Sequence, residues 1–390
     1  MTPAPKRPAT IGNRFLLLSV LFAIGATLLW QHVGAEPQDR APINDATHLE
    51  TTVIAEGFEF PWSLAFLPDG GFLVTEREGR LQHLSADGKT RREITGLPAI
   101  YVAGQAGLFD ITLAPDFAQS GLVYFAFAAG SAEENNTELA RAQLDIENAQ
   151  LKDVQIIFRA QPKTKGRAHY GGRILFMPDG TLLLTLGDRF AYRDNAQNTT
   201  DHLGTVVRLM PDGSIPADNP FKDGPAPAVY THGNRNVQGI ALHPDSGAIW
   251  AHEHGPRGGD EINILISGAN YGWPVVTHGR EYSGLAITDK RHMKGMEDPL
   301  LHWTPSIAPS GMAFYTGDKM PQWRGDLFVG ALAGRHLRRL DIEGGRIIRQ
   351  EKLLTTLEAR IRDVRNGPDG YIYILTDALD GQLLRYGPKR

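Results

Sequence analysis

Phe66-Leu67-Pro68-Asp69-Gly70 leads directly into the strand-forming run GFLVTE at residues 71–76. The phrase returns at residues 176–180 (FMPDG) before TLLLTLGD, and at residues 367–370 (GPDG) before YIYILTD. In each copy Pro presets φ at the first central position of a tight turn, Asp bonds back to the backbone, and Gly accepts the positive φ that follows. Each phrase therefore predicts a β-hairpin, and its recurrence predicts a repeated β-architecture.

From Thr51 onward the chain is dominated by short runs of strand-forming residues. About twenty such runs are bounded by Gly, Pro, Asp or Asn. They predict an all-β fold, a six-bladed β-propeller of four-stranded antiparallel blades. Longer insertions lie at residues 188–202, 215–228 and 275–305, and loops of that length are usually functional or disordered. A propeller gathers loops from every blade at one central mouth, so residues distant in sequence can form one site.

The composition narrows the function classes. The 390 residues include 40 basic and 44 acidic side chains, with a formal net charge of −4 and no long run of one sign. This balance argues against a nucleic-acid partner. Cys is absent, which excludes disulfides and thiolate ligands. No P-loop, GxSxG or helix-opening GxGxxG occurs, so nucleotide and NAD chemistry are unsupported.

The N-terminus has the three parts of a secretory signal peptide. Basic residues (Lys6, Arg7 and Arg14) precede an apolar stretch at residues 15–30, and small residues follow at 33–35. We therefore expect residues 1–35 to be a signal peptide or an uncleaved anchor, 36–48 a linker, and 49–390 a single propeller domain. This layout predicts a periplasmic protein, attached to the inner membrane only where the segment is not cleaved.

Two polar segments are candidates for catalysis. His169 opens a Gly-rich edge before a strand and has the pKa range of a general base, and Asp188, one hairpin later, could orient its imidazole. Arg235 and Asn236 lie in a dense polar turn, where a guanidinium suits carboxylates and an amide both donates and accepts. A loop His bonded to backbone and a solvated turn are the alternatives.

Residues 252–263 combine carboxylates at 253, 260 and 261 with Gly and Pro, whose backbone carbonyls are free to bind. Such hard oxygen ligands suit Ca²⁺. His252 and His254 raise the alternative of zinc, but no third ligand is evident, and we favour Ca²⁺. Arg360 and Arg362 alternate along a strand and so share one side. They predict either a polyanionic ligand or a solvent-facing basic stripe.

Together these segments resemble the soluble PQQ-dependent aldose sugar dehydrogenases, the glucose/sorbosone dehydrogenase-like family of six-bladed propellers. The resemblance covers roughly residues 50–386, nearly the whole predicted mature chain, and its motifs are specific in this order. They are FPWSLAFLPDG, GQAGLFDITLAPDF, HYGGRILFMPDGTLLLTLGDR, GNRNVQGIALHP, EHGPRGGDEINIL, NYGWP, PSIAPSGMAFY and RIRDVRNGPDGYIYILTD.

The resemblance implies a role for each matching residue. The implied catalytic residues are His169 as the base, Asp188 as its orienting partner, and Arg235, which steadies charge on the quinone oxygen. The implied contacts to PQQ are Gln105, Arg235, Asn236, Tyr282, Arg335, Arg360 and Arg362. The implied Ca²⁺ ligands are Gly255, Pro256, Glu261 and Tyr271.

The chain departs from the glucose-specific relatives at one position. Where those relatives place a Lys, this sequence has Ala333, and Arg335 two residues later is the expected replacement. The sequence therefore matches Arg360 and Arg362 to two of the contacts with the carboxylates of PQQ, but it does not determine which residue makes the third.

The resemblance implies oxidation of an aldose at its anomeric carbon to a lactone. Ca²⁺ would act as a Lewis acid on PQQ, His169 would take the hydroxyl proton as hydride moves to the cofactor, and an external acceptor would collect the electrons. Two alternatives stay open. A calcium-dependent propeller lactonase would have a similar fold but would not need Arg235, Arg360 and Arg362. A non-catalytic binding module is the other, because fold alone does not give function.

Overall fold

The computed structural model describes Met1 and residues 48–389, which include the whole predicted propeller apart from Arg390. The predicted signal or anchor (1–35) and nearly all of the predicted linker (36–48) lie outside the described residues. Within these residues, twenty-four strands form six four-stranded sheets, in which sequence neighbours pair antiparallel except that β1 pairs with β24. The predicted six-bladed β-propeller is therefore confirmed.

The blades are numbered here in chain order. Blades 1 to 3 contain β2 (Pro61–Phe66), β3 (Phe72–Glu76), β4 (Arg80–Leu84), β5 (Arg91–Ile94), β6 (Leu108–Leu113), β7 (Leu122–Gly130), β8 (Asn135–Asp145), β9 (Gln150–Arg159), β10 (Ile174–Phe176), β11 (Leu182–Thr185), β12 (Val206–Leu209) and β13 (Val229–Thr231). Blades 4 to 6 contain β14 (Val237–Leu242), β15 (Ile249–Glu253), β16 (Asp260–Leu265), β17 (Leu301–Trp303), β18 (Pro309–Phe314), β19 (Leu327–Ala331), β20 (His336–Glu343), β21 (Arg346–Leu353), β22 (Ile361–Asn366), β23 (Ile372–Thr376), β24 (Gly381–Pro388) and β1 (Leu49–Phe58).

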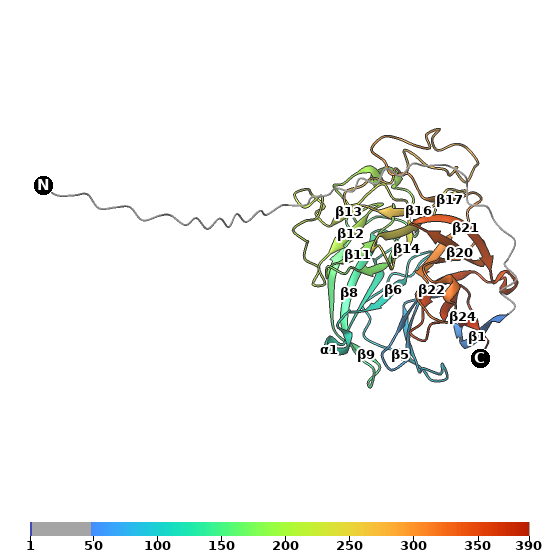
Figure 1. The fold of residues 1–390 in the computed structure, drawn as a ribbon. Coiled ribbons are helices and arrows are strands. Elements are labelled where there is room, and N and C mark those ends of the chain that lie inside the picture. The colour runs from blue at the N-terminus through green and yellow to red at the C-terminus, as the bar shows by residue number, and fades with distance from the viewer. Residues whose placement is uncertain (2–47, 390) are drawn as a thin grey trace. The chain divides into compact units, whose positions relative to one another are not determined.

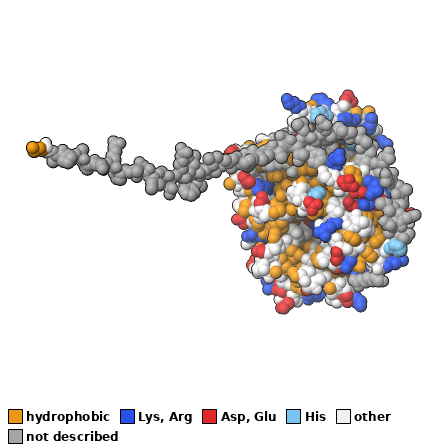
Figure 2. All heavy atoms as spheres, viewed as in Figure 1, with side chains coloured by type: hydrophobic (Ala, Val, Ile, Leu, Met, Phe, Trp, Pro, Cys, Tyr) orange, Lys and Arg blue, Asp and Glu red, His pale blue; other side chains and the backbone are white. Residues whose placement is uncertain are grey.

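Helices are short in this part of the chain. They are α1 (Phe117–Ser120) and the 3₁₀ turns η2 (Arg193–Gln197), η3 (Pro321–Trp323) and η4 (Thr355–Leu357). None of the helices described is long and apolar enough to cross a membrane. On the face shown in Figure 2, acidic and basic side chains are interspersed.

The Pro-Asp-Gly phrases form the turns between the first two strands of blades 1, 3 and 6. In blade 1 the Gly70 N–H donates to Leu67 O at 2.9 Å, and the Gly71 N–H donates to Asp69 Oδ1 at 2.9 Å. The Gly of each phrase has a φ between +82° and +88°, a conformation that side chains other than Gly adopt at a cost. The Asp residues of these turns therefore have a structural role.

The ring is closed by strands from both ends of the described chain. β1 pairs antiparallel with β24, from Leu49 opposite Pro388 to Phe58 opposite Gly381, and Figure 1 shows the blue and red strands side by side. The first strands of successive blades contact one another around the ring. The N-terminal strand thus covers an edge of blade 6 that would otherwise be open.

Buried ion pairs join the inner strands. Asp363 on β22 accepts from Arg173 Nη1 and from Arg365 Nε, both at 2.8 Å, and Asp110 on β6 accepts from Arg365 Nη2 at 2.5 Å. We call Asp110, Arg173, Asp363 and Arg365 the axial network. Burial raises the pKa of Asp110, but the two guanidiniums outweigh it and hold that pKa below its usual value. The network ties blades 2, 3 and 6 together.

Replacing Asp363 with Ala should strongly destabilise the propeller. The change leaves Arg173 with no carboxylate closer than Asp110, 3.6 Å away, and removes the acceptor of the Leu64 N–H. Breaking a buried ion pair from one side costs about 3–5 kcal/mol. Chemical denaturation should show this loss in the free energy of unfolding.

The matched control is Asp218→Ala, which removes an ion pair with Arg208 at 2.8 Å from a carboxylate that is 76% exposed. We expect little change, because solvent screens such pairs. Equal effects of the two substitutions would contradict a structural role for the axial network.

Candidate active site

His169 and Asp188 form a buried pair at the mouth of the propeller. The imidazole Nδ1 lies 2.6 Å from Asp188 Oδ1, and the side chains are only 5% and 1% exposed. The backbone N–H of His169 donates to Gln105 Oε1 at 2.8 Å. The predicted base, its predicted orienting partner and the predicted Gln105 are therefore brought together.

Asp188 is fixed from two other directions. Its Oδ1 accepts the Phe190 N–H at 2.8 Å, and its Oδ2 accepts the Trp273 indole N–H at 2.8 Å. Burial raises the pKa of Asp188, but its hydrogen bond and charge interaction with His169 keep the pKa below its usual value. Because an ionised carboxylate only accepts hydrogen bonds, His169 Nδ1 must donate, which leaves the Nε2 lone pair for a substrate proton.

The pKa of His169 lies below its ordinary value of 6.5, chiefly because burial disfavours the charged imidazolium. The hydrogen bond to Asp188 opposes this effect, while the positive charge of Arg235 adds to it. The neutral form required of a general base therefore predominates at neutral pH.

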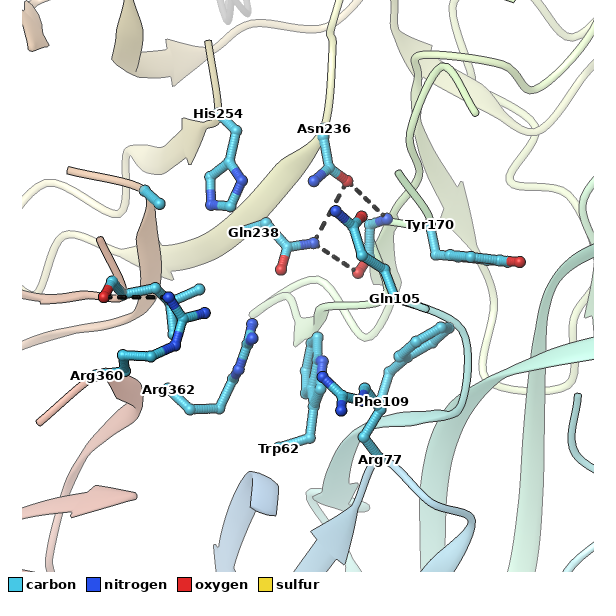
Figure 3. A pocket seen from close by; sticks show the side chains of 13 residues that line it. Trp62, Arg77, Gln105, Phe109, Tyr170, Asn236, Gln238, His254, Arg360 and Arg362 are labelled. Carbon is cyan, nitrogen blue, oxygen red and sulfur yellow. Dashed lines mark hydrogen bonds between the residues drawn. The ribbon is translucent and has the colours of Figure 1, made fainter. Parts of the chain in front are cut away.

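Beside this pair lies a cavity of about 250 Å³, which we call the axial pocket. All six blades, or the loops that precede their first strands, contribute to its wall. The lining residues are Trp62, Arg77, Gln105, Phe109, Tyr170, Gly171, Asn236, Gln238, His254, Ala308, Leu332, Arg360 and Arg362. Figure 3 shows the aromatic rings of Trp62 and Phe109 beside the guanidiniums. The predicted Gln105, Asn236, Arg360 and Arg362 all belong to this wall.

The axial pocket carries an excess of positive charge. Asp377 pairs with Arg360 at 2.9 Å and with Arg362 at 3.4 Å, whereas Arg77 pairs with the more exposed Glu78 at 3.5 Å. Burial lowers the pKa of Arg362, and its Nε is buried without a hydrogen-bond partner. Three guanidiniums around Asp377 and one unpartnered donor fit a planar ligand with several carboxylates.

The backbone approaches this pocket closely at Gly171. Its φ is +66°, and an added Cβ would lie 2.4 Å from Thr185 O, so only Gly fits here. The Gly171 N–H donates to Asn236 Oδ1 at 3.1 Å, and Gln238 Nε2 donates to Gly171 O at 3.0 Å. These bonds orient the amide side chains of Asn236 and Gln238 at the wall (Figure 3).

Arg235 lines a second, smaller cavity, and the next residue, Asn236, lines the axial pocket. Arg235 Nη1 donates to the carbonyls of His254 at 2.9 Å and Gly255 at 3.0 Å. The Glu253 carboxylate stabilises the turn that contains Arg235. It accepts a hydrogen bond from the Arg235 N–H and another from the side-chain amide of Asn234 at 3.0 Å. Burial raises the pKa of Glu253 to about 7.

The smaller cavity, which we call the side pocket, holds two acidic side chains. It is lined by Arg235, Glu253, His254, Gly255, Gly259, Glu261, Tyr271, Trp273, Val276 and Thr277. Glu253 and Glu261 are directly opposite each other on β15 and β16. Burial, and next the charge of Glu253, raise the pKa of Glu261 well above its usual value. Two facing carboxylates, of which Glu253 is buried and Glu261 is partly buried, are unfavourable without a cation between them.

The donor set of the side pocket fits a hard cation such as Ca²⁺. Among the described residues no group of three or more His, Asp and Glu side chains converges as a metal site, so a cation would also need backbone carbonyls. The predicted Gly255 and Tyr271 lie in this wall beside Glu261, whereas Pro256 is not among the lining residues. The Tyr271 hydroxyl donates to Ile264 O at 2.7 Å, which leaves its carbonyl as the candidate ligand.

Two other residues of segment 252–263, Asp260 and His254, make hydrogen bonds that stabilise the surrounding backbone. Asp260 accepts four hydrogen bonds, including those from the N–H groups of Gly255 at 2.8 Å and Ile307 at 2.7 Å. His254 Nε2 donates to Pro309 O at 2.6 Å, and both ring nitrogens of His252 are buried without a hydrogen-bond partner. The alternative of a zinc site gains no support from this arrangement.

Three predicted cofactor contacts are not among the lining residues of the axial pocket: Arg235, which lines the side pocket, Arg335 and Tyr282. Arg335 is exposed, has a φ of +50° and is not among the lining residues. Tyr282 is 59% exposed, and its hydroxyl accepts from Arg235 Nη2 at 3.4 Å.

The sequence reasoning missed Trp62, Arg77 and Asp377 at the axial pocket. It named Glu253 as one of three carboxylates that suit Ca²⁺ but did not include it among the implied ligands. Arg77 lies in the mouth-side turn between β3 and β4, with its guanidinium over the Phe60 ring at 4.3 Å. A basic residue directly after a strand was the available signal for Arg77. The pairing of Asp377 with Arg360 and Arg362 had no local signal.

Comparisons with known proteins find relatives that match nearly the whole propeller. The family model described as Glucose / Sorbosone dehydrogenase matches residues 58–385. The chain is 41% identical over 343 residues to aldose sugar dehydrogenase YliI of Escherichia coli (strain K12), covering 86% of this chain and 92% of the relative.

Two solved structures are similar along nearly the whole propeller. A crystal structure of glucose dehydrogenase has 46% identity and a TM-score of 0.84, covering 87% of this chain and 100% of that one. The PQQ-bound form of an aldose sugar dehydrogenase from Streptomyces coelicolor has 29% identity and a TM-score of 0.72, covering 89% and 100%.

Titration of His169 should give a pKa below 6.5, and Asp188→Asn should lower it further. The reason is that burial favours the neutral imidazole, while the Asp188 carboxylate is what stabilises the charged form. Histidine NMR resonances followed against pH, with His169 assigned from His169→Ala, measure both values.

Asp194→Asn is the matched control, because this carboxylate is 92% exposed and does not contact His169. It should leave the pKa of His169 unchanged. A wild-type value at or above 6.5, or an Asp188→Asn value that does not fall, would rule out this electrostatic account.

Proposed function

Because the chain belongs to the glucose/sorbosone dehydrogenase family, we propose that it oxidises aldose sugars at the anomeric carbon to lactones, with PQQ as cofactor and Ca²⁺ as its metal. The observation that carries the proposal is the axial pocket, with its three guanidiniums, beside the His169–Asp188 pair. A lactonase acting on a neutral lactone would not need this positive charge.

Arg77, Arg360 and Arg362 would hold PQQ through its three carboxylates, and Trp62 would lie against its planar ring system. Gln105 and Asn236 would contribute hydrogen bonds from the opposite wall. In this arrangement Arg77 takes the place that Arg335 had in the sequence-based expectation. The excess of positive charge in the axial pocket supports this assignment, because a tricarboxylate would neutralise it.

Glu261, with the carbonyls of Tyr271 and Gly255, would hold the Ca²⁺ ion. When bound, PQQ supplies the two-electron oxidising chemistry, which a nearby Ca²⁺ ion strengthens by withdrawing electron density from the quinone. Gly255 O already accepts a hydrogen bond from Arg235, so Arg235 supports the backbone of the proposed metal site.

His169 Nε2 would accept the proton of the anomeric hydroxyl while C1 is oxidised. Asp188 would hold the imidazole in the required tautomer and stabilise the imidazolium that forms, without itself becoming protonated. A positioned general base of this kind contributes about 10²–10⁴-fold to the rate. Arg235 would steady negative charge that develops on the quinone oxygen, and an external acceptor would collect the electrons.

The expected export signal in residues 1–35 leads us to propose a periplasmic location, with membrane attachment where that segment is retained.

PQQ should bind the purified protein, and aldose-dependent dye reduction should appear only with PQQ and Ca²⁺ together. Absorbance titration measures the Kd for PQQ, and Arg77→Met should raise it about tenfold or more, because a charge-assisted hydrogen bond is lost. His169→Ala should bind PQQ normally but lose about a hundredfold or more of its turnover.

Arg335→Met is the matched control and should leave the Kd for PQQ unchanged, because Arg335 lies outside the pocket. A stronger effect of Arg335→Met than of Arg77→Met would reverse our assignment of these residues. Folded protein that takes up PQQ and Ca²⁺ but oxidises none of several aldoses would refute the proposed function.

Ca²⁺ should raise the thermal stability of the protein, because a bound ion favours the ionised forms of the facing Glu253 and Glu261, which burial otherwise disfavours. At a hundred times its Kd a bound ion adds about 2.7 kcal/mol. Differential scanning calorimetry should show that Ca²⁺ raises the Tm of the wild-type protein. Glu261→Gln should abolish this shift. Glu343→Gln, at an exposed carboxylate, is the matched control and should retain it. An equal shift in the Glu261→Gln protein would place the ion elsewhere.

A further inference from the structure

Two exposed aromatic side chains, Phe190 and Tyr282, stand next to the His169–Asp188 pair. Phe190 is 53% exposed and Tyr282 is 59% exposed. Their ring centroids are 6.3 Å apart with an angle of 30° between the planes, and the Phe190 ring lies 5.3 Å from the His169 imidazole. We call these two rings the aromatic pair. Two exposed rings that lie close together beside a polar site offer a ligand at that site an apolar surface.

The backbone holds Phe190 in this exposed position. Arg189 and Phe190 both have positive φ values, +57° and +65°, which are strained for residues other than Gly. The buried Arg189 guanidinium donates to Ala168 O at 2.7 Å and lies 3.6 Å from the Tyr170 ring centroid. These contacts, with the Phe190 N–H bonded to Asp188, fix the direction in which the phenyl ring points.

Tyr282 is also held, and from a different loop. Its hydroxyl accepts from Arg235 at 3.4 Å, and the neighbouring Glu281 pairs with Arg193 of η2 at 2.5 Å. The ion pair connects the two loops that carry the aromatic pair. Both exposed rings are therefore held in place. Phe190 lies next to the His169 imidazole, and Tyr282 lies next to Phe190.

We propose that the aromatic pair binds the C–H faces of a saccharide and extends the site to a second sugar residue, so that reducing disaccharides are better substrates than free hexoses. The inference rests on the proposed function, since it assigns the substrate class of that same site. Phe190, nearest His169, would pack against the sugar being oxidised. Tyr282, farther out, would meet the sugar that follows.

The chemistry of sugars favours this use of the aromatic pair. A pyranose ring presents apolar C–H groups on its faces and hydroxyl groups at its edge, so its face packs on an aromatic ring while its edge stays hydrated. Covering two rings removes more apolar surface from water than covering one. A docked protein is a poorer candidate, because a stable interface needs about 800 Å² from each partner, far more than two rings provide.

The test compares substrates on the enzyme loaded with PQQ and Ca²⁺. Wild-type protein should show a higher kcat/KM for maltose or cellobiose than for D-glucose. Phe190→Ala should lower kcat/KM for the preferred disaccharide about tenfold, mainly through KM, with a smaller change for D-glucose. Phe190→Tyr, which keeps an aromatic ring, should restore the preference.

A readout that needs no turnover accompanies the kinetics. Methyl cellobioside has a blocked anomeric hydroxyl and cannot be oxidised at C1. Its C–H resonances should shift upfield on binding to wild-type protein, because protons above an aromatic face are shielded, and the shift should shrink in Phe190→Ala. Ile348→Ala is the matched control, since Ile348 is a 41% exposed apolar side chain on the distant outer strand β21.

The inference is overturned if wild-type protein prefers D-glucose to both disaccharides. It is also overturned if Phe190→Ala lowers kcat/KM equally for all three sugars. In both cases the proposed function stands, because sugars are still oxidised. Loaded protein that oxidises no aldose would instead refute the proposed function, and the inference with it.

Discussion

The axial network is the constraint on which the rest of the structure depends. Its two guanidiniums and two carboxylates come from blades 2, 3 and 6, and each charge is tolerated in the interior only because the others compensate it. Arg173 also donates to Gln238 O at 2.9 Å and to Arg362 O at 3.2 Å. The same side chain therefore joins the blades and supports the wall of the axial pocket.

The site consists of two neighbouring cavities, one lined by three guanidiniums and the other by two acidic side chains. The axial pocket is positive because Asp377 is shared by Arg360 and Arg362 while Arg77 adds a third guanidinium. The side pocket holds the acidic groups, since Glu253 and Glu261 face each other, and burial raises the pKa of both carboxyls. Arg235 lines the side pocket and donates to its backbone carbonyls. A polyanion and a cation placed side by side would relieve both imbalances, which is the electrostatic argument for PQQ with Ca²⁺.

Much of this could be predicted from the sequence, because the signals were local. The Pro-Asp-Gly turns and the short strand runs predicted six four-stranded blades, and the structure confirms them. His169 and Asp188 were expected as a pair and lie 2.6 Å apart. That Glu253 faces Glu261 and that Arg77 reaches the axial pocket could not be predicted, since each depends on what lies across strands or blades. Arg335 was the reasonable sequence choice, yet its loop leaves it exposed.

By itself the sequence determined the repeated hairpin, the residue types available for catalysis and the absence of cysteine chemistry. Turn geometry and strand propensity act over a few residues, so they can be read along the chain. Only the tertiary structure decided which charges meet. Asp363 and Arg173 are 190 positions apart, and Phe190 and Tyr282 belong to different loops. Ring closure brings such residues together, and burial then determines their protonation and their partners.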